Sequence, residues 1–314
     1  MSTWAKQKWV NALADQDMLD RHLSSTSTRK GELQRAVAKA MRRHALNDEL
    51  PTAATFLFYE LEQEGVVSKK PINTRTGAPR VRTERQDIAD ALLVLREEGL
   101  VPWLAVVDAT RQLRQWNYAK TVLAYVRARL PEARIDLWDE KPPPLILCES
   151  RSMAGVLEDL AWQYLCPITG TSGQTKGYLY TDVAPLFDED VDQQVLYIGD
   201  LDHQGGQIER NTQNVLVRAI GREIPWMRIA ITAEQSESME PIWKTDERYK
   251  PHALHEAWEA EALGQGAIKE ILRATLDTLL PKPLEQVLKR ENAERKRDDK
   301  RLKALDEKQG ARRR

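Results

Sequence analysis

Two short apolar runs, each followed at once by an acidic residue or a Gly-Asp pair, place the strongest limit on how this chain can fold. Leu145–Cys148 and Val195–Ile198 are both wholly apolar, and a segment with helical spacing follows each of them. Continuous apolar runs of this kind are typical of parallel strands that are buried on both faces. A third strand is expected at Trp226–Ile231. Because these strands alternate with helices, the second half of the chain is predicted to be an α/β domain with a parallel sheet.

The first half of the chain has a different pattern. Residues 1–48 are polar with apolar residues at helical spacing, which predicts an N-terminal helical segment. Residues 49–111 then contain a helix ending at Gly65, a short strand, a basic turn-rich segment, a second helix ending at Gly99, and the apolar run Leu100–Val107. We expect the last run to be a strand. This order of elements predicts a winged-helix-like DNA-binding module.

The remaining boundaries follow from prolines and charge. Residues 112–144 are predicted to link the two halves, because the three prolines at 142–144 can neither continue a helix nor enter a central strand. The α/β domain is then expected to span residues 145–282. Residues 283–314 are rich in lysine and arginine and poor in apolar residues, which predicts an exposed, charged helical tail.

Overall charge does not predict nucleic-acid binding, because the 47 Lys and Arg residues are balanced by 48 Asp and Glu residues. The prediction rests on a local patch. Between residues 69 and 85 there are six basic residues and one acidic residue, with Gly77-Ala78-Pro79 as a candidate hairpin tip. Such a tip can contact DNA phosphates, although a solvated loop is the alternative. The candidate DNA-binding residues are Lys69, Lys70, Arg75, Arg80, Arg82 and Arg85.

Three carboxylates come directly after predicted strands. Glu149 follows the first strand, and Asp200 and Asp202 follow the second. Ligands of open α/β sheets collect at this carboxyl edge, and clustered carboxylate oxygens suit Mg²⁺ or Mn²⁺. The alternative is that an aspartate here caps the next helix. Glu259, expected near the start of a helix, is a further candidate for the same site.

These residues resemble those of a known family. Glu149, the loop Gly170–Gly173 and the sequence Gly199-Asp-Leu-Asp-His-Gln-Gly-Gly206 are similar to the Toprim domain of topoisomerases, primases and certain nucleases. The closest similarity is to the A subunit of topoisomerase VI and its relative, the meiotic double-strand-break protein. In the family a small residue usually follows the second aspartate, whereas His203 stands there in this chain.

The resemblance also implies a catalytic tyrosine ahead of the α/β domain. In that family the tyrosine lies in a winged-helix domain, and Phe56-Leu57-Phe58-Tyr59 occupies the corresponding place, which makes Tyr59 the candidate nucleophile. Such a tyrosine forms a covalent link to a DNA phosphate. The family's arginine four residues earlier corresponds to Thr55 here, so a phosphate clamp is missing. The alternative is that Tyr59 only packs in the core of its module.

The sequence therefore predicts a DNA-binding, Mg²⁺-dependent enzyme that cleaves DNA strands. Cleavage would proceed either by attack of Tyr59 or by metal-activated hydrolysis, with Glu149, Asp200 and Asp202 around the metal. A non-catalytic DNA-binding regulator with a vestigial site is the alternative. A nucleotide-binding α/β enzyme acting on small phosphorylated substrates is disfavoured, because the first half of the chain would then have no evident function.

Partners and location follow from the same reasoning. DNA is the predicted partner, a homodimer is expected if two strands are cut, and strand passage would need a separate ATPase subunit because no GxxxxGK[ST] motif occurs. Export is not expected, because residues 1–13 contain no long apolar segment of the signal-peptide kind, and a membrane span is not expected, because no apolar window is long enough. With only Cys148 and Cys166, it also lacks a disulfide framework. We therefore expect a cytoplasmic protein.

Overall fold

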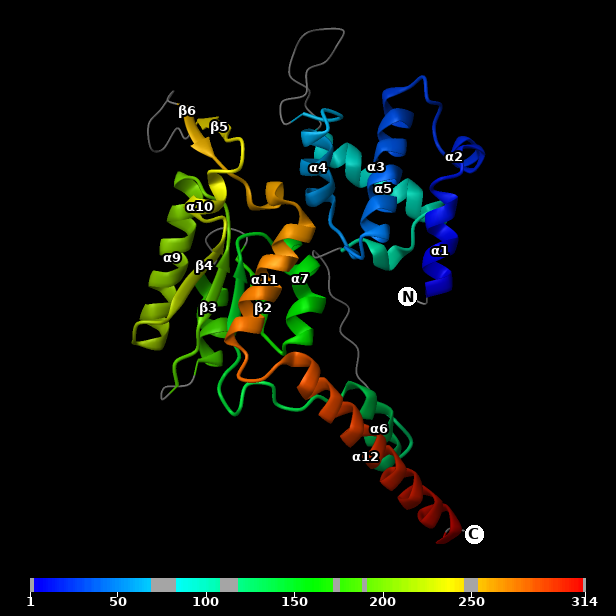
Figure 1. The fold of residues 1–314 in the computed structure, drawn as a ribbon, viewed down its shortest axis with the longest axis vertical. Helices are drawn as coiled ribbons and strands as arrows, with labels where there is room; N and C mark the ends of the chain where they lie inside the picture. Colours follow the sequence, from blue (N-terminus) through cyan, green and yellow to red (C-terminus); the bar gives the residue numbers. More distant parts are fainter. Residues whose placement is uncertain are drawn as a thin grey trace.

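The computed structural model describes residues 3–68, 83–107, 118–171, 176–187, 191–245 and 254–312. Figure 1 shows a helical N-terminal part beside an α/β part, from which a long C-terminal helix extends. No helix in the described part of the chain is long and apolar enough to cross a membrane.

Five helices form the N-terminal part: α1 (Thr3–Ala12), α2 (Gln16–His22), α3 (Arg29–Leu46), α4 (Ala54–Gln63) and α5 (Glu84–Glu97). They share one hydrophobic core, to which Val37 of α3, Leu57 of α4 and Leu92 of α5 each contribute a buried side chain. Both α3 and α5 begin at a threonine whose hydroxyl accepts a backbone hydrogen bond, as expected for helix caps. Most of the predicted basic hairpin, residues 69–82, lies outside the described residues.

The apolar run Leu100–Val107 does not form the expected strand. Gly99 turns the chain with φ +70°, and Pro102 precedes the 3-10 helix η1 (Trp103–Ala105). Only a single parallel bridge, between Thr52 and Val106, remains of the expected strand pairing. The run is apolar because it closes the helical core, not because it enters a sheet.

The described part of the second half contains a four-stranded, all-parallel sheet, which confirms the predicted parallel sheet and adds a strand, β2, that was not predicted. Its strands are β1 (Leu145–Cys148), β2 (Ile168–Gly170), β3 (Val195–Ile198) and β4 (Trp226–Ala230), in the order β2-β1-β3-β4. Helix α7 (Arg151–Gln163) connects β1 to β2, and helix α9 (His203–Ile220) connects β3 to β4. Between β2 and β3 lie the short segments α8 (Lys176–Tyr178), η3 (Leu179–Val183) and η4 (Ala184–Leu186).

The two central strands are buried on both faces. Ile146 of β1 and Leu196 of β3 belong to the core that includes α7 and α11 (Gln265–Leu279), whereas Leu147 and Tyr197 belong to the core that includes α9 and η3. Alternate residues of a strand point to opposite faces, so a strand covered on both faces must be apolar throughout. This requirement explains why both apolar runs lack any polar residue.

A hairpin and a 3-10 helix follow the sheet near its carboxyl edge. Helix α10 (Ala233–Ser236) leads to the antiparallel pair β5 (Ile242–Thr245) and β6 (Leu254–Ala257), and then to η5 (Ala260–Leu263) and α11. The expected helix start near Glu256 and Glu259 is therefore wrong: residues 254–257 form a strand, and Glu259 immediately precedes η5. Main-chain pairing with β5 outweighs the helical composition of this segment.

The long helix α12 (Leu284–Arg312) leaves the sheet domain, and the short helix α6 (Val122–Arg129) lies beside it (Figure 1). After α6 comes the 3-10 turn η2 (Leu130–Glu132). The Arg127 guanidinium on α6 lies 3.4 Å from the Asp306 carboxylate, and Arg134 lies 2.9 Å from the buried Glu291. Ion pairs therefore join α12 to α6 and to the segment before β1, and near the start of α12 the buried Val287 belongs to the same hydrophobic core as Leu137.

Polar contacts fix the N-terminal helices against the α/β part. The Gln265 side chain at the start of α11 donates to the carbonyl of Pro51 at 2.7 Å, and Lys269 donates to the carbonyl of Glu49 at 2.9 Å. From α4, the Gln63 amide donates to the Ala262 carbonyl in η5 at 2.8 Å. These bonds place α4 at the carboxyl edge of the sheet, over residues more than 190 positions later in the sequence.

The same junction contains a charged cluster centred on Glu60 of α4. Its carboxylate accepts hydrogen bonds from Arg43 Nε at 2.8 Å and makes a 2.9 Å contact with Nε2 of the buried His44. Burial alone would raise the pKa of Glu60, but His44 and Arg43 outweigh it and hold this pKa below its usual value. The charged form of Glu60 therefore stabilises the fold above its unfolded pKa of about 4.3.

We expect Glu60→Gln to lower the free energy of unfolding by about 1–3 kcal/mol at neutral pH, because the neutral glutamine cannot form the ion pair with Arg43. The contribution of Glu60 is lost as the pH falls through its depressed folded-state pKa, so the difference from the wild type should shrink below about pH 4. Urea unfolding at several pH values measures both effects. Glu62→Gln, on the same helix, is the matched control, and an equal loss in that variant would contradict the assignment.

Candidate active site

A cavity of about 420 Å³ opens at the carboxyl edge of the sheet, where the N-terminal helices meet the α/β part. Its functional side chains come from segments that are far apart in the sequence. They are Tyr59 and Arg85 from the helical part, and Glu149, Arg151, Asp200, Glu259 and Glu261 from the α/β part. The cavity thus combines a phenol, two guanidinium groups and four carboxylates.

Sheet pairing places Glu149 beside Asp200. Cys148 pairs with Ile198 in the β1–β3 register, and the Asp200 amide donates to the Glu149 carboxylate at 3.0 Å. Between them, Gly199 leaves no room for a side chain, because a Cβ there would lie 2.8 Å from Glu149 Oε2. Burial, followed by repulsion from Asp200, raises the pKa of Glu149 to about 7.

Asp202 is held differently from Asp200. It caps α9, with its carboxylate accepting a hydrogen bond from the Gly205 amide at 2.6 Å, so this helix begins at His203. The other carboxylate oxygen lies 2.9 Å from Lys244 Nζ on β5. Burial opposes ionisation, but these contacts outweigh it and hold the pKa of Asp202 below its usual value. Asp202 therefore borders the cavity that Asp200 lines, and it performs the capping role that was the alternative.

Two glutamates after β6 complete the acidic cluster. The Ala260 amide donates to Asp200 at 2.8 Å, and Ser150 donates to the buried Glu261 at 2.9 Å. Glu259 is also buried; burial and the neighbouring Glu261 raise its pKa to about 7, although Lys244 Nζ lies 3.1 Å from its carboxylate. Burial likewise raises the pKa of Glu261. The cluster is thus short of compensating positive charge.

Tyr59 and Arg85 face this cluster as a pair. The Arg85 guanidinium donates to the Tyr59 hydroxyl at 2.5 Å, packs over the Tyr59 and Phe58 rings, and lies 3.8 Å from the Glu259 carboxylate. Thr55, where the resemblance implied an arginine, accepts a hydrogen bond from Ser152 of α7 at 3.4 Å. The guanidinium beside Tyr59 comes instead from Arg85, on the next helix of the chain.

Arg228 of β4 fixes the backbone that carries Asp200. Its guanidinium donates to the carbonyls of Gly199 at 2.9 Å and Asp200 at 3.3 Å. It also donates to the Ile231 carbonyl at 3.0 Å and forms an ion pair with Glu209 of α9 at 2.6 Å. One side chain thus joins the ends of β3 and β4 to α9. Arg228 is not predicted as a site residue from the sequence, because it acts through the spatial packing of separate elements. The contacts of Lys244 with the acidic residues depend on the same kind of packing.

Five of the six predicted DNA-binding residues are not placed by the structure. Lys69, Lys70, Arg75, Arg80 and Arg82 lie outside the described residues, so Arg85 is the member of the basic patch that the structure places. It contacts Tyr59 in the cavity.

The expected Gly-rich loop is described only as far as residue 171. Its first glycine, Gly170, is a packing point, because a Cβ there would lie 2.7 Å from the Arg151 Cα.

The donor chemistry of the cavity suits a hard cation. Its carboxylates offer only oxygen ligands. Burial, together with repulsion from neighbouring carboxylates, raises the pKa values of Glu149 and Glu259, and a divalent cation would relieve that repulsion. Within the described residues, no three His, Cys, Asp or Glu side chains already stand as a metal site. Binding would therefore require carboxylates to turn toward the ion.

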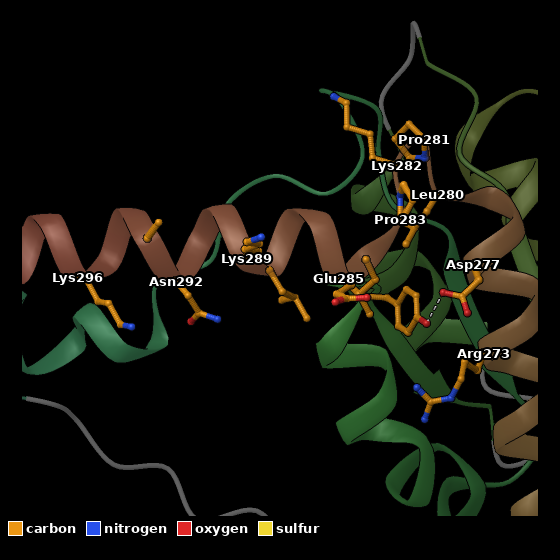
Figure 2. Close-up of a pocket in the computed structure, with 14 residues that line it drawn as sticks. Arg273, Asp277, Leu280, Pro281, Lys282, Pro283, Glu285, Lys289, Asn292 and Lys296 are labelled. Atoms are coloured by element: carbon orange, nitrogen blue, oxygen red, sulfur yellow. Dashed lines mark hydrogen bonds between the residues drawn. The ribbon is translucent and has the colours of Figure 1, made fainter.

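A larger hollow, of about 1020 Å³, lies at the bend between α11 and α12. Figure 2 shows Asn292 and Lys296 projecting from α12 along it, and the hydrogen bond from Tyr164 to Asp277, which is 2.6 Å long. Burial and this bond raise the pKa of Tyr164 to about 12, so its phenol stays protonated at neutral pH. Because no cluster of buried carboxylates lines this hollow, the smaller acidic cavity is the candidate active site.

Comparison of the chain with protein-family models, with curated proteins and with solved structures gives no match. The case for a function therefore rests on the geometry of the cavity and on the sequence motifs.

Proposed function

We propose that this chain is a DNA strand-cleaving enzyme with a Toprim-like acidic site, and that Tyr59 is its nucleophile. The observation that carries the proposal is the meeting of Tyr59, Arg85 and the strand-end carboxylates in one cavity. A tyrosine that served only to pack the helical core would not need a hydroxyl directed at a guanidinium beside four carboxylates. The arrangement supplies a nucleophile, a cation next to it and candidate bases.

In the proposed reaction, a DNA phosphate becomes covalently linked to the enzyme. The Tyr59 hydroxyl oxygen attacks the phosphorus, a new phosphorus–oxygen bond forms, and the bond to one deoxyribose oxygen breaks. The tyrosine proton passes to Glu259, whose pKa of about 7 suits a base that works at neutral pH. The departing deoxyribose oxygen takes up a proton from water. Arg85 holds the tyrosine oxygen in place and offsets negative charge beside it.

Glu149 and Asp200 would hold Mg²⁺ or Mn²⁺, with Asp202 at the border of the site. When bound, the ion would neutralise charge on the phosphate and orient the reacting oxygens. Arg228 and the Ala260 amide would keep Asp200 in place, and the glycine at 199 lets Glu149 approach it closely.

A non-catalytic DNA-binding protein is the second candidate, and one contact favours it. The Lys244 ammonium already lies between Asp202 and Glu259, at 2.9 and 3.1 Å, so part of the acidic cluster is neutralised without a metal. In that case the cavity would be structural, and DNA binding would not depend on a divalent cation.

Removing the metal distinguishes the two candidates. We expect the wild-type chain to nick or linearise supercoiled plasmid in Mg²⁺ or Mn²⁺, to lose this activity in excess EDTA, and to recover it when Mg²⁺ is restored. Gel electrophoresis with and without detergent and protease would show the products and any attached protein. Cutting that survives EDTA would contradict the metal role, and DNA that is bound but never cut would favour the non-catalytic candidate.

A further inference from the structure

Two arginines line the acidic cavity, and they differ in what they contact. Arg85 is engaged by the Tyr59 hydroxyl and approaches Glu259. Arg151, the first residue of α7, is exposed and pairs with no carboxylate within the described part of the chain. A guanidinium that stands beside several carboxylates without pairing with one is available to an anion from outside.

The backbone of Arg151 is fixed although its side chain is exposed. The preceding Ser150 caps α7, accepting from the Met153 amide at 3.1 Å, and its hydroxyl donates to Glu261 at 2.9 Å. On the other side, β2 packs so closely that a Cβ on Gly170 would lie 2.8 Å from the backbone nitrogen of Arg151. The base of the side chain is therefore held at the cavity, two residues after Glu149, while its charged end is free to reach a ligand.

The charges that line the cavity determine where a DNA phosphate could bind. Four carboxylates line it against two guanidinium groups, so a DNA phosphate would meet repulsion there unless a cation received it. Arg85 is already committed to the tyrosine. Because a guanidinium can bind two phosphate oxygens at once, Arg151 is suited to this task.

We propose that Arg151 binds a backbone phosphate of the DNA strand in the cavity and so positions that strand against Tyr59. This inference rests on the proposed function, since it takes DNA as the ligand. Arg151 would contact the substrate directly, whereas the carboxylates hold the metal and Arg85 holds the nucleophile.

The test compares the wild type with Arg151→Ala and Arg151→Lys on a short DNA duplex, in Mg²⁺ for cleavage and in Ca²⁺ for binding. Loss of one phosphate contact should weaken binding roughly tenfold at 0.1 M salt and reduce the slope of log K against log salt by about 0.9. Arg151→Lys should keep the slope but recover cleavage only partly, because a lysine lacks the bidentate geometry. Arg218→Ala, in the last turn of α9 and so at the far end of the sheet, is the control.

The outcomes separate this inference from the function on which it rests. An unchanged salt slope in a folded Arg151→Ala variant overturns the role of Arg151, whether or not the wild type cleaves. A wild type that binds the duplex without cleaving it contradicts the proposed function, while the slope still decides on Arg151. If the wild type does not bind DNA, both proposals fail.

Discussion

Replacing Tyr59 by phenylalanine should abolish covalent attachment of the protein to cleaved DNA and reduce cleavage on the order of 10³-fold or more. Phenylalanine keeps the buried ring that packs beside Phe58 but removes the hydroxyl that Arg85 contacts. The fold should therefore be retained while the attacking oxygen is lost. Plasmid cleavage in Mg²⁺, followed by detergent and by gels with and without protease, measures both effects.

Tyr118→Phe is the matched control, because Tyr118 is 93% exposed and does not line the cavity. It should cleave as the wild type does. Free DNA ends from the wild type, together with full cleavage by Tyr59→Phe, would exclude the tyrosine as nucleophile and leave hydrolysis at the acidic site. A Tyr59→Phe protein that fails to cleave but shows a changed thermal midpoint would instead be a folding defect, so the unfolding curve accompanies the assay.

Asp200→Asn should reduce cleavage by about 100-fold or more. Removing a residue that only supports a metal ligand typically costs about 10- to 100-fold, and Asp200 is proposed to be a ligand itself. Asparagine has the same shape and retains an oxygen that can accept the Ala260 amide, but it lacks the charge. The variant should therefore fold normally and bind Mn²⁺ more weakly. Titration with Mn²⁺, followed by electron paramagnetic resonance, measures the metal without requiring DNA or turnover.

Asp306→Asn on α12 provides the control, since its carboxylate is half exposed and lies near Arg127 in the arm. Equal Mn²⁺ binding by the wild type and Asp200→Asn would show that the acidic cavity does not hold the ion. Normal metal binding combined with lost cleavage would place Asp200 in the reaction but not in the metal site.

The fold of the second half was largely predictable because burial on both faces imposes a strict pattern. Leu145–Cys148 and Val195–Ile198 contain no polar residue, and both form central strands of the parallel sheet. Errors occurred where tertiary contacts outweigh composition. The segment around Glu256 is a strand because it pairs with β5, and the run Leu100–Val107 closes the helical core instead of forming a strand.

The candidate site was predictable only where the sheet itself determines it. The carboxyl ends of neighbouring parallel strands meet at one edge, so the proximity of Glu149 and Asp200 followed from the strand pattern. The contact of Arg85 with Tyr59 could not be predicted from sequence patterns. It depends on how α5 packs on α4, and no local rule gives the facing side chains of two helices. Arg228 was missed for the same reason, and so were the contacts of Lys244 with Asp202 and Glu259.

By itself, the sequence determined which segments become central strands and which acidic residues lie at their ends, because local apolar patterns record burial directly. Only the tertiary structure decided that a tyrosine from the helical part meets those residues in one cavity, that Asp202 turns to cap a helix, and that Arg151 is left without a carboxylate among the described residues. These outcomes depend on contacts between segments separated by tens to hundreds of residues. Packing and hydrogen bonding select such contacts after the local elements have formed.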